Sequence, residues 1–520
     1  MTLKKLSVAV AMIMAGQAQA AQGPSSSATP YVTPTAAGIS VTSILTVGDA
    51  AANGYKMVGI PDGLGAYDNG DGTFTVLMNH ELGSTEGISR AHGSKGAFVS
   101  QWVINKSTLA VISGQDMIQS AANVFTGGAG GVWTAGTTSF GRLCSADLPA
   151  LPAFYNANSG KGYNGRIFMN GEESGNEGRA FGFVATGTGA NTVYELPYLG
   201  KFSWENSVAN PYAGDKTVVI GLDDSTPGQV YVYSGTKQIS GNAVEMAGLN
   251  NGTLKGIKVN TANAQGGTSG NLEQGQINGG FTTVLVDTSV NGATQQANAR
   301  AAGVTEFARP EDGHWADAKT FYFVTTGADP DGAGVVGTQT ARLYKISFNE
   351  VAGVVDYDNG TVSMVTDAAS LTGTDGATAR SFDNMFVNGN TILIQEDPGN
   401  SQYNAKTWMS GDGGATWTQI LMSDVSRFGN SDGTILATAP FNKDEENSGI
   451  VEITDILGKN DGKRYFLADM QAHYGITGEL VQGGQLYLVS APVPEPETYA
   501  MMLAGLGLMG VVARRRAARA

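Results

Sequence analysis

Only one of the 520 residues is a cysteine, Cys144. An internal disulfide is therefore excluded, and the thiol is buried and inert, paired with another molecule, or a ligand. Histidine is nearly as scarce, because His80, His92, His314 and His473 are the only ones in the chain. They form no HExxH motif and no other zinc spacing, which disfavours a zinc hydrolase.

Charge is also scarce, and it is unevenly divided. Charged residues make up 15% of the chain, with 46 acidic against 31 basic side chains and a net charge of −15. Such a chain repels nucleic acid and anionic lipid and attracts cations, so we expect no nucleic-acid partner. No Gly-x-x-x-x-Gly-Lys-Ser or -Thr motif occurs, so nothing supports a nucleotide triphosphatase.

The chain is rich in glycine, with 73 residues, and in the β-forming residues Thr, Val and Tyr. This composition is typical of an all-β extracellular protein. The N-terminus agrees with that location. Met1–Ala20 has two lysines, an apolar stretch and a small-residue site at Ala18-Gln19-Ala20, which predicts a secretory signal peptide. Residues 21–44 are rich in Ser, Thr, Pro, Ala and Gly, and we expect a flexible linker there.

The C-terminal segment, residues 493–520, has a different pattern. Val493-Pro494-Glu495-Pro496-Glu497 precedes the mostly apolar run Tyr499–Ala513, and Arg514–Arg516 follow it. The apolar run is short for a transmembrane helix of about 20 residues. This order closely resembles the PEP-CTERM sorting signal. The resemblance implies export, transient contact with the inner membrane, and an exosortase as partner, with release or anchoring at the cell surface, in the periplasm or in the extracellular matrix.

Between these ends, six apolar runs each stop at a cluster of acids or amides, and a second run usually follows. Starts that lie about 50 to 104 residues apart suit radial strand repeats with insertions. We therefore predict a six-bladed β-propeller with loop and helical insertions over residues 45–492. The six runs are TFTVLMNHE, RIFMNGEE, KTVVIGLDD, TFYFVTTGADPD, TILIQED and RYFLADMQAH.

The acids at the strand ends suggest a site. If the blades share one axis, equivalent strand ends meet, and their carboxylates converge as ligands for a polyvalent cation. A simpler interpretation is that Asp, Asn and Gly end strands because they suit turns. The segment Ser410–Trp417 fits the Asp-box turn S-x-D-x-G-x-T-W of sialidase-like propellers, where it is structural. This turn keeps open a further functional interpretation, a propeller that binds or cleaves glycans.

The blocks between Gly54 and Ser490, taken in order, resemble the PhoX-type alkaline phosphatase family. The matching segments are LMNHELG, the block from GRLC to GEES, KFSWENSV, FARPEDGHW, SFDNMFV before ILIQED, EENSGIVEITDIL and FLADMQAHYG. The resemblance implies a propeller whose axial site holds iron and calcium and hydrolyses phosphate monoesters. It assigns a catalytic role to Arg309, which would hold the phosphate. It assigns metal-ligand roles to Cys144, Glu173, Glu205, Glu311 and Asp397.

Two alternatives remain open from the residues. Arg309 and Glu311 also fit a structural ion pair. The whole propeller also fits a non-catalytic, calcium-stabilised surface or biofilm-matrix protein sorted by an exosortase. The long spacing from Cys144 to Glu173, and Trp204 where family members tend to carry histidine, favour that rival. The presence of Cys144, Arg309 and Glu311 favours the enzyme.

The sorting interpretation predicts the effect of a change in the tail. Basic residues after an apolar run stay on the cytoplasmic side of the membrane, so neutral residues at Arg514–Arg516 should alter retention or processing. The folded body should be unaffected. Cell fractionation and the mass of the C-terminal peptide provide the measurement. Identical localisation and tail mass for both forms would argue against a sorting role.

Overall fold

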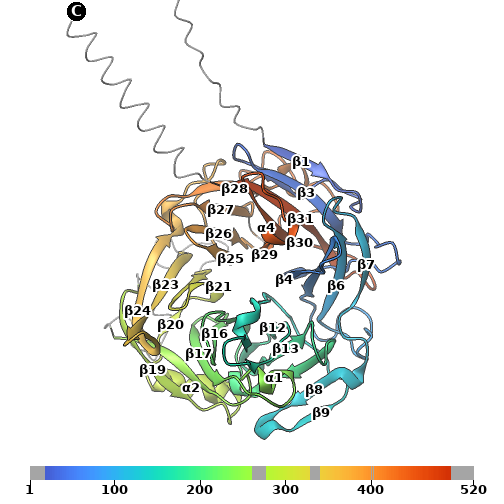
Figure 1. The fold of residues 1–520 in the computed structure, drawn as a ribbon. Helices are drawn as coiled ribbons and strands as arrows, with labels where there is room; N and C mark the ends of the chain where they lie inside the picture. The colour runs from blue at the N-terminus through green and yellow to red at the C-terminus, as the bar shows by residue number, and fades with distance from the viewer. Residues whose placement is uncertain (1–17, 261–276, 328–339, 400, 402, 494–520) are drawn as a thin grey trace, which may run out of the picture.

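The structure is a computed structural model that describes residues 18–260, 277–327, 340–399, 401 and 403–493. In these residues the chain forms a ring of β-sheets around a common axis (Figure 1). The predicted all-β class is confirmed. Strand pairing in the described residues gives five large sheets, because β19 pairs with β24 and joins two strand groups into one sheet. The count of six blades therefore stays a prediction.

The first sheet contains β4 (Pro61–Asp68), β5 (Thr73–His80), β6 (Phe98–Asn105) and β7 (Val111–Asp116). The second contains β12 (Ile167–Gly171), β13 (Ala180–Val184), β14 (Thr192–Glu195), β8 (Val124–Gly127) and β9 (Trp133–Ala135). The long third sheet runs through β15 (Trp204–Ala209), β16 (Lys216–Asp223), β17 (Gly228–Thr236), β18 (Thr253–Val259), β19 (Gly279–Val286), β24 (Val354–Asp367), β23 (Arg342–Val351), β22 (Thr320–Thr325) and β21 (Pro310–Asp317), with β20 (Glu306–Phe307) on β17.

The fourth sheet contains β25 (Phe382–Asn388), β26 (Thr391–Glu396), β27 (Lys406–Ser410), β28 (Thr418–Ser423) and β2 (Val32–Pro34). The fifth contains β29 (Glu445–Glu452), β30 (Lys463–Gly475), β31 (Gln482–Pro492), β3 (Ser40–Thr46) and β1 (Gln19–Gln22). A separate hairpin pairs β10 (Tyr155–Asn156) with β11 (Lys161–Gly162). The α-helices are α1 (Ala243–Met246), α2 (Gly292–Ala301), α3 (Val425–Phe428) and α4 (Thr454–Leu457).

The core lies between neighbouring sheets. On β30, Phe466 and Ala468 pack in one cluster with Leu393 of β26, whereas Leu467 packs in another with Phe74 of β5. Successive side chains of a strand point to opposite faces, so each face of β30 meets a different sheet. Because both faces are buried, the middle of this strand has four consecutive apolar residues, Tyr465–Ala468, instead of an alternating pattern.

The structure corrects the expected linker. Within residues 21–44, β2 pairs with β28, and β3 pairs in antiparallel register with β31, for example Val41 with Val489. A segment with few apolar residues does not fold alone, but Val32 and Ile44 become buried because existing sheets supply the rest of the core. The pairing of β3 with β31 joins the N-terminal and C-terminal ends of the domain in one sheet.

The two targeting segments fall mostly outside the described residues. Of the predicted signal peptide, residues 1–17 lie outside them, and β1 begins at Gln19. Of the sorting segment and its short transmembrane-like helix, residues 494–520 lie outside them. In the part of the chain that the structure describes, no helix has the length and apolar character needed to span a membrane.

The corrected role of β3 can be tested by substitution. Ile44 is fully buried on β3, so Ile44→Ala should lower the free energy of unfolding by about 2 to 5 kcal/mol. Ile112 on β7 is 42% exposed, and Ile112→Ala serves as the matched control with an expected change within about 0.5 kcal/mol. Denaturant unfolding of the mature chain measures both. Equal, small effects would show that β3 adds nothing to the fold.

Candidate metal centre

One backbone hydrogen bond recurs at the axis. Its donor is the amide of a residue at or near the end of the second strand of a unit. Its acceptor is a backbone carbonyl at or near the start of the first, innermost strand of the same unit. Two positions after that carbonyl, the chain carries a buried side chain such as Asp62. The bond occurs six times in the described residues, with N–O distances of 2.8 to 3.1 Å: Glu81 to Ile60, Glu173 to Arg142, Asp224 to Ser203, Thr326 to Arg309, Asp397 to Ser381 and His473 to Asp444.

This bond defines three sets of residues that we name by their role in it. Ring A contains the residues two positions after each acceptor: Asp62, Cys144, Glu205, Glu311, Asp383 and Glu446. Ring B contains the donors: Glu81, Glu173, Asp224, Thr326, Asp397 and His473. Ring C contains the acceptors: Ile60, Arg142, Ser203, Arg309, Ser381 and Asp444. Every ring A side chain is buried, so each bond brings one buried ring A residue and one ring B residue to the same end of its unit.

Cys144 reaches ring A in a slightly different way. It lies outside the named strands, but the bridges of Leu143 with Glu172 and of Asp147 with Met169 align its segment against β12. The segment therefore acts as an extra first strand beside β12 and places Cys144 where the other units place an acid.

Four ring C residues have a left-handed backbone. The φ angles are 53° at Ile60, 37° at Arg142, 58° at Arg309 and 45° at Ser381. Non-glycine residues rarely adopt this conformation because of the Cβ, and they keep it only where the surrounding structure holds them. Its recurrence two residues before a ring A side chain indicates that the strain serves to orient these side chains.

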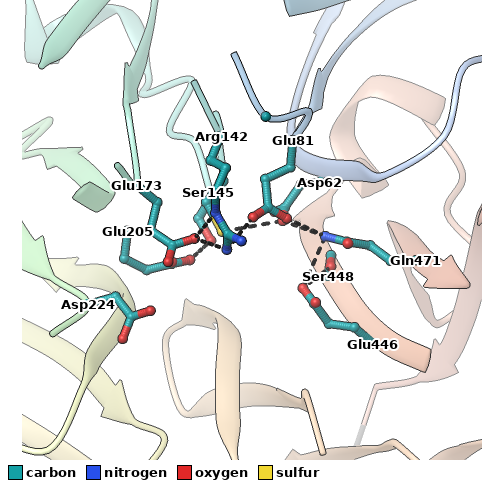
Figure 2. A network of polar contacts seen from close by, with 12 residues as sticks. Asp62, Glu81, Arg142, Ser145, Glu173, Glu205, Asp224, Glu446, Ser448 and Gln471 are labelled. Carbon is teal, nitrogen blue, oxygen red and sulfur yellow. Dashed lines mark hydrogen bonds and ion pairs between the residues drawn. The ribbon is translucent and has the colours of Figure 1, made fainter. Parts of the chain in front are cut away.

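The ligand atoms converge in three overlapping trios. In each, one ligand atom per residue lies within 4.8 Å of the others. Cys144 belongs to two of the trios and Glu205 to two, so the trios form one continuous cluster. Figure 2 labels Asp62, Glu81, Glu173, Glu205 and Asp224 of this cluster. The trios are Asp62, Glu81 and Cys144; Cys144, Glu173 and Glu205; and Glu205, Asp224 and Glu311.

Burial and mutual repulsion oppose ionisation in this cluster. Burial, reinforced by the charge of Asp224, raises the pKa of the Glu205 carboxyl to about 8. Burial and the charge of Asp62 raise the pKa of the Cys144 thiol well above its usual range. Burial, followed by the charge of Glu446, raises the pKa of the Asp397 carboxyl to about 7. These groups therefore ionise together at neutral pH only if further positive charge is present.

Three cationic side chains supply part of that charge. Arg142 pairs with Glu81 at 2.6 Å and also with Glu173 (Figure 2). Arg309 donates from Nε and Nη2 to the two oxygens of Asp224 at 2.7 and 2.8 Å. Its Nη2 also lies 3.3 Å from Glu311 Oε1.

His473 is the third cation. Its Nε2 lies 3.6 Å from Glu446 Oε2. Burial lowers the pKa of the His473 imidazole, but the hydrogen bond and charge of Glu446 outweigh it and raise this pKa to about 10. The imidazole therefore stays protonated at neutral pH.

A cavity of about 560 Å³ opens onto the cluster. Its described lining includes the acids Glu81, Asp397 and Glu446 and the cations Arg142 and His473. Arg309 is not part of that lining. The cavity therefore gives a ligand access to the cluster on the side of Arg142.

The donor set fits bound cations. Carboxylate oxygens are the ligands of calcium, and a thiolate beside carboxylates suits a metal that accepts soft and hard donors, such as iron. Divalent or trivalent cations would also remove the repulsion that raises the pKa values of Glu205 and Asp397. The residues present thus satisfy both the chemistry and the charge requirement of such a site.

All six residues predicted from the sequence lie in the three rings. Cys144, Glu173 and Glu205 form one trio, and Glu311 joins Glu205 in another. Arg309 contacts Glu311, as the ion-pair alternative allows. Asp397 lies in ring B but outside the trios. Their roles in catalysis and metal binding stay predictions.

Sequence reasoning missed other members of the cluster. Glu81 and Asp224 each end an apolar run, so the strand-end pattern in the sequence is a signal that could have identified them. Asp62 comes at the start of β4, where no acidic cluster marks it, and Arg142 precedes the cysteine without any strand signal. Both positions follow only from the backbone register.

A family model described as Alkaline phosphatase PhoX matches residues 153–454, more than half of the chain. The chain belongs to the PhoX alkaline phosphatase family. Glu173, Glu205, Arg309, Glu311 and Asp397 lie within the matched residues of this PhoX-family protein.

The N-terminal part of the cluster, residues 62–144, precedes the matched residues, so its place in the site comes from the structure alone. The PEP-CTERM protein-sorting motif matches residues 492–516. This signal indicates export and surface association and implies processing by an exosortase.

A solved structure shares the fold. PhoX of Pseudomonas fluorescens, in complex with vanadate as a transition-state analogue, matches with a TM-score of 0.56 and 11% identity over 88% of this chain and 96% of that one. A GH93 α-L-arabinofuranosidase of Fusarium graminearum gives a TM-score of 0.37 and 9% identity over 82% of this chain and 92% of that one. At 11% identity the likeness to the Pseudomonas structure concerns the fold alone. No curated protein matches the sequence significantly.

The cluster predicts how metal removal and pH act on stability. The pKa values of Glu205 and Asp397, about 8 and about 7, lie above their ordinary values of 4.5 and 3.8. The metal-free folded chain then binds more protons than the unfolded chain, so its stability should fall as the pH rises from about 4 to 8. Added calcium should raise the melting temperature most at the upper end of that window.

Thermal melts of the PhoX-family protein at several pH values, with and without chelator, provide the measurement. Elemental analysis confirms that the metal has been stripped. A melting curve that chelation leaves unchanged at pH 8 would contradict a stabilising cation site.

Proposed function

We propose that this PhoX-family protein is an exported, metal-dependent phosphatase that hydrolyses phosphate monoesters at the axial cluster. The observation that carries the proposal is the convergence of one buried thiol and six buried or partly buried carboxylates in three overlapping trios. Family membership supports the reaction class.

The donor atoms suggest how two metals are divided. Trios that include Cys144 offer a sulfur beside carboxylates and suit iron, whereas Glu205, Asp224 and Glu311 offer oxygen only and suit calcium. When bound, the metals would neutralise the acids, activate a water-derived nucleophile and stabilise negative charge on the phosphoryl oxygens. The pKa of the Cys144 thiol, which burial raises, makes a thiolate there dependent on such a metal.

Arg309 contributes a fixed positive charge beside the same carboxylates. Its guanidinium binds both oxygens of Asp224 and also contacts Glu311. These contacts hold the guanidinium in place inside the cluster. A planar guanidinium matches the geometry of phosphoryl oxygens, and it stays protonated at any working pH. In this proposal Arg309 stabilises the charge that develops on the transferred group.

Export brings the protein to its place of action. We propose that an exosortase processes the tail after transient contact with the inner membrane, and that the product resides at the cell surface, in the periplasm or in the extracellular matrix. The sorting motif at residues 492–516 supports this part of the proposal.

The alternative is a non-catalytic surface or matrix propeller that calcium stabilises. Two observations favour it: the oxygen-only trio suits calcium without iron, and Arg309 is engaged by two carboxylates as a structural ion pair would be. This alternative requires neither iron nor turnover.

Two substitutions separate metal binding from catalysis. Cys144→Ser should lose iron and activity together, because a hydroxyl is a much poorer soft ligand than a thiolate. Arg309→Ala should keep its metals and lose turnover of a phosphomonoester by about a hundredfold to a thousandfold, the typical cost of one transition-state contact. Elemental analysis and steady-state kinetics measure the two effects.

The same experiment decides between the candidate functions. Wild-type protein loaded with iron and calcium but inactive on every monoester would favour the calcium-stabilised propeller. An active protein with fully competent Cys144→Ser would keep the phosphatase and exclude Cys144 as a required ligand.

A further inference from the structure

We propose that Arg142 is the residue that receives the phosphoryl group of the substrate at the mouth of the axial cavity. This inference rests on the proposed phosphatase function and adds a substrate-binding residue to it. The resemblance of the sequence assigned the phosphate to Arg309, and the geometry points to Arg142 as a further residue that binds it at the cavity entrance.

Arg142 and Arg309 occupy equivalent positions in two units. Both belong to ring C, and both have a left-handed backbone, with φ angles of 37° and 58°. Each carbonyl accepts the repeated backbone bond, from Glu173 at 2.8 Å and from Thr326 at 3.1 Å. Each guanidinium lies between two carboxylates of the cluster. The unit that contains Cys144 therefore presents an arginine in the same way as the unit that contains Glu311.

The two arginines differ in their access to a ligand. The Arg309 side chain is 25% exposed and lies outside the cavity lining, and Asp224 holds its Nε and Nη2. The Arg142 side chain is 51% exposed and lines the cavity. Its Nε and Nη2 bind Glu81 and Glu173, and no partner of Nη1 occurs among the described residues. Arg142 thus has free N–H donors at the entrance.

The charges around the cavity support the same assignment. Its described lining combines the acids Glu81, Glu86, Asp397, Asp444 and Glu446 with two cationic side chains, Arg142 and His473. His473 is paired with Glu446. A phosphate dianion that enters this acidic cavity needs a cation with free donors, and Arg142 provides one.

The carboxylates that now hold Arg142 also belong to the metal-binding trios. Once Glu81 and Glu173 serve as metal ligands, they share their oxygens between the metal and Arg142. The Arg142 guanidinium can then direct N–H donors to phosphoryl oxygens. Charge-assisted pairs of this kind are short and often bidentate, and lysine does not reproduce their geometry. Arg142 therefore contributes to substrate binding as well as to charge balance.

The test compares Arg142→Ala and Arg142→Lys with the wild type. We expect Arg142→Ala to raise both the KM for a phosphomonoester and the inhibition constant of inorganic phosphate by tenfold or more, with iron and calcium content retained. Arg142→Lys should remain several-fold weaker than wild type. Arg166→Ala is the matched control, because Arg166 lies in a separate cavity and has no ion pair among the described residues. It should leave both constants unchanged.

An Arg142→Ala protein that keeps its metals and binds inorganic phosphate as tightly as wild type would overturn the inference. If Arg142→Ala loses metal, Arg142→Lys decides: weaker phosphate binding with metals retained supports the inference, and unchanged binding or metal loss overturns it.

Calorimetric titration with inorganic phosphate separates this inference from the proposed function. Wild-type protein that binds phosphate without turnover, with weaker binding in Arg142→Ala, would contradict the phosphatase and support Arg142. Turnover that Arg142→Ala leaves unchanged would do the opposite. Wild-type protein that shows neither binding nor turnover would contradict both.

Discussion

A repeated backbone hydrogen bond places the acidic side chains of this protein. It ties the end of a second strand to the residue two positions before a first-strand side chain, and it does so with Glu81, Asp224 and Asp397 as donors in three of its copies. Neither partner can move away without breaking this backbone hydrogen bond, and a backbone N–H or C=O left unpaired inside the protein costs free energy. The carboxyl groups therefore stay close together, and their repulsion is relieved by protonation or by bound cations.

That constraint links the fold to the chemistry. Buried carboxylates without sufficient counter-charge are expensive, and the arginines compensate them only in part. Burial and the neighbouring Asp224 raise the pKa of Glu205 to about 8, while Arg142 and Arg309 pair with other carboxylates of the cluster. Cations at the axis would relieve this cost and, in doing so, create the positive field that a phosphate ester requires. Stability and the proposed catalysis then depend on the same few atoms.

The sequence predicts the parts of this arrangement that are local. Strand runs ending in acids predicted the all-β class and marked Glu173 and Asp397, because strand period and turn chemistry are readable over ten residues. The strand β3 was missed, because its partner β31 lies more than 400 residues away and no local signal announces that pairing. Asp62 and Arg142 were missed for a related reason, since their places follow from register and from left-handed backbone at residues 60 and 142.

The most direct test of the metal centre is an anomalous diffraction map of the mature protein, recorded above and below the iron absorption edge. The account predicts an iron peak within bonding distance of Cys144 Sγ, with calcium density among the carboxylates of Glu205, Asp224 and Glu311. A fully occupied crystal grown with both metals that shows no peak beside Cys144, or metal bound only away from the three rings, would contradict it.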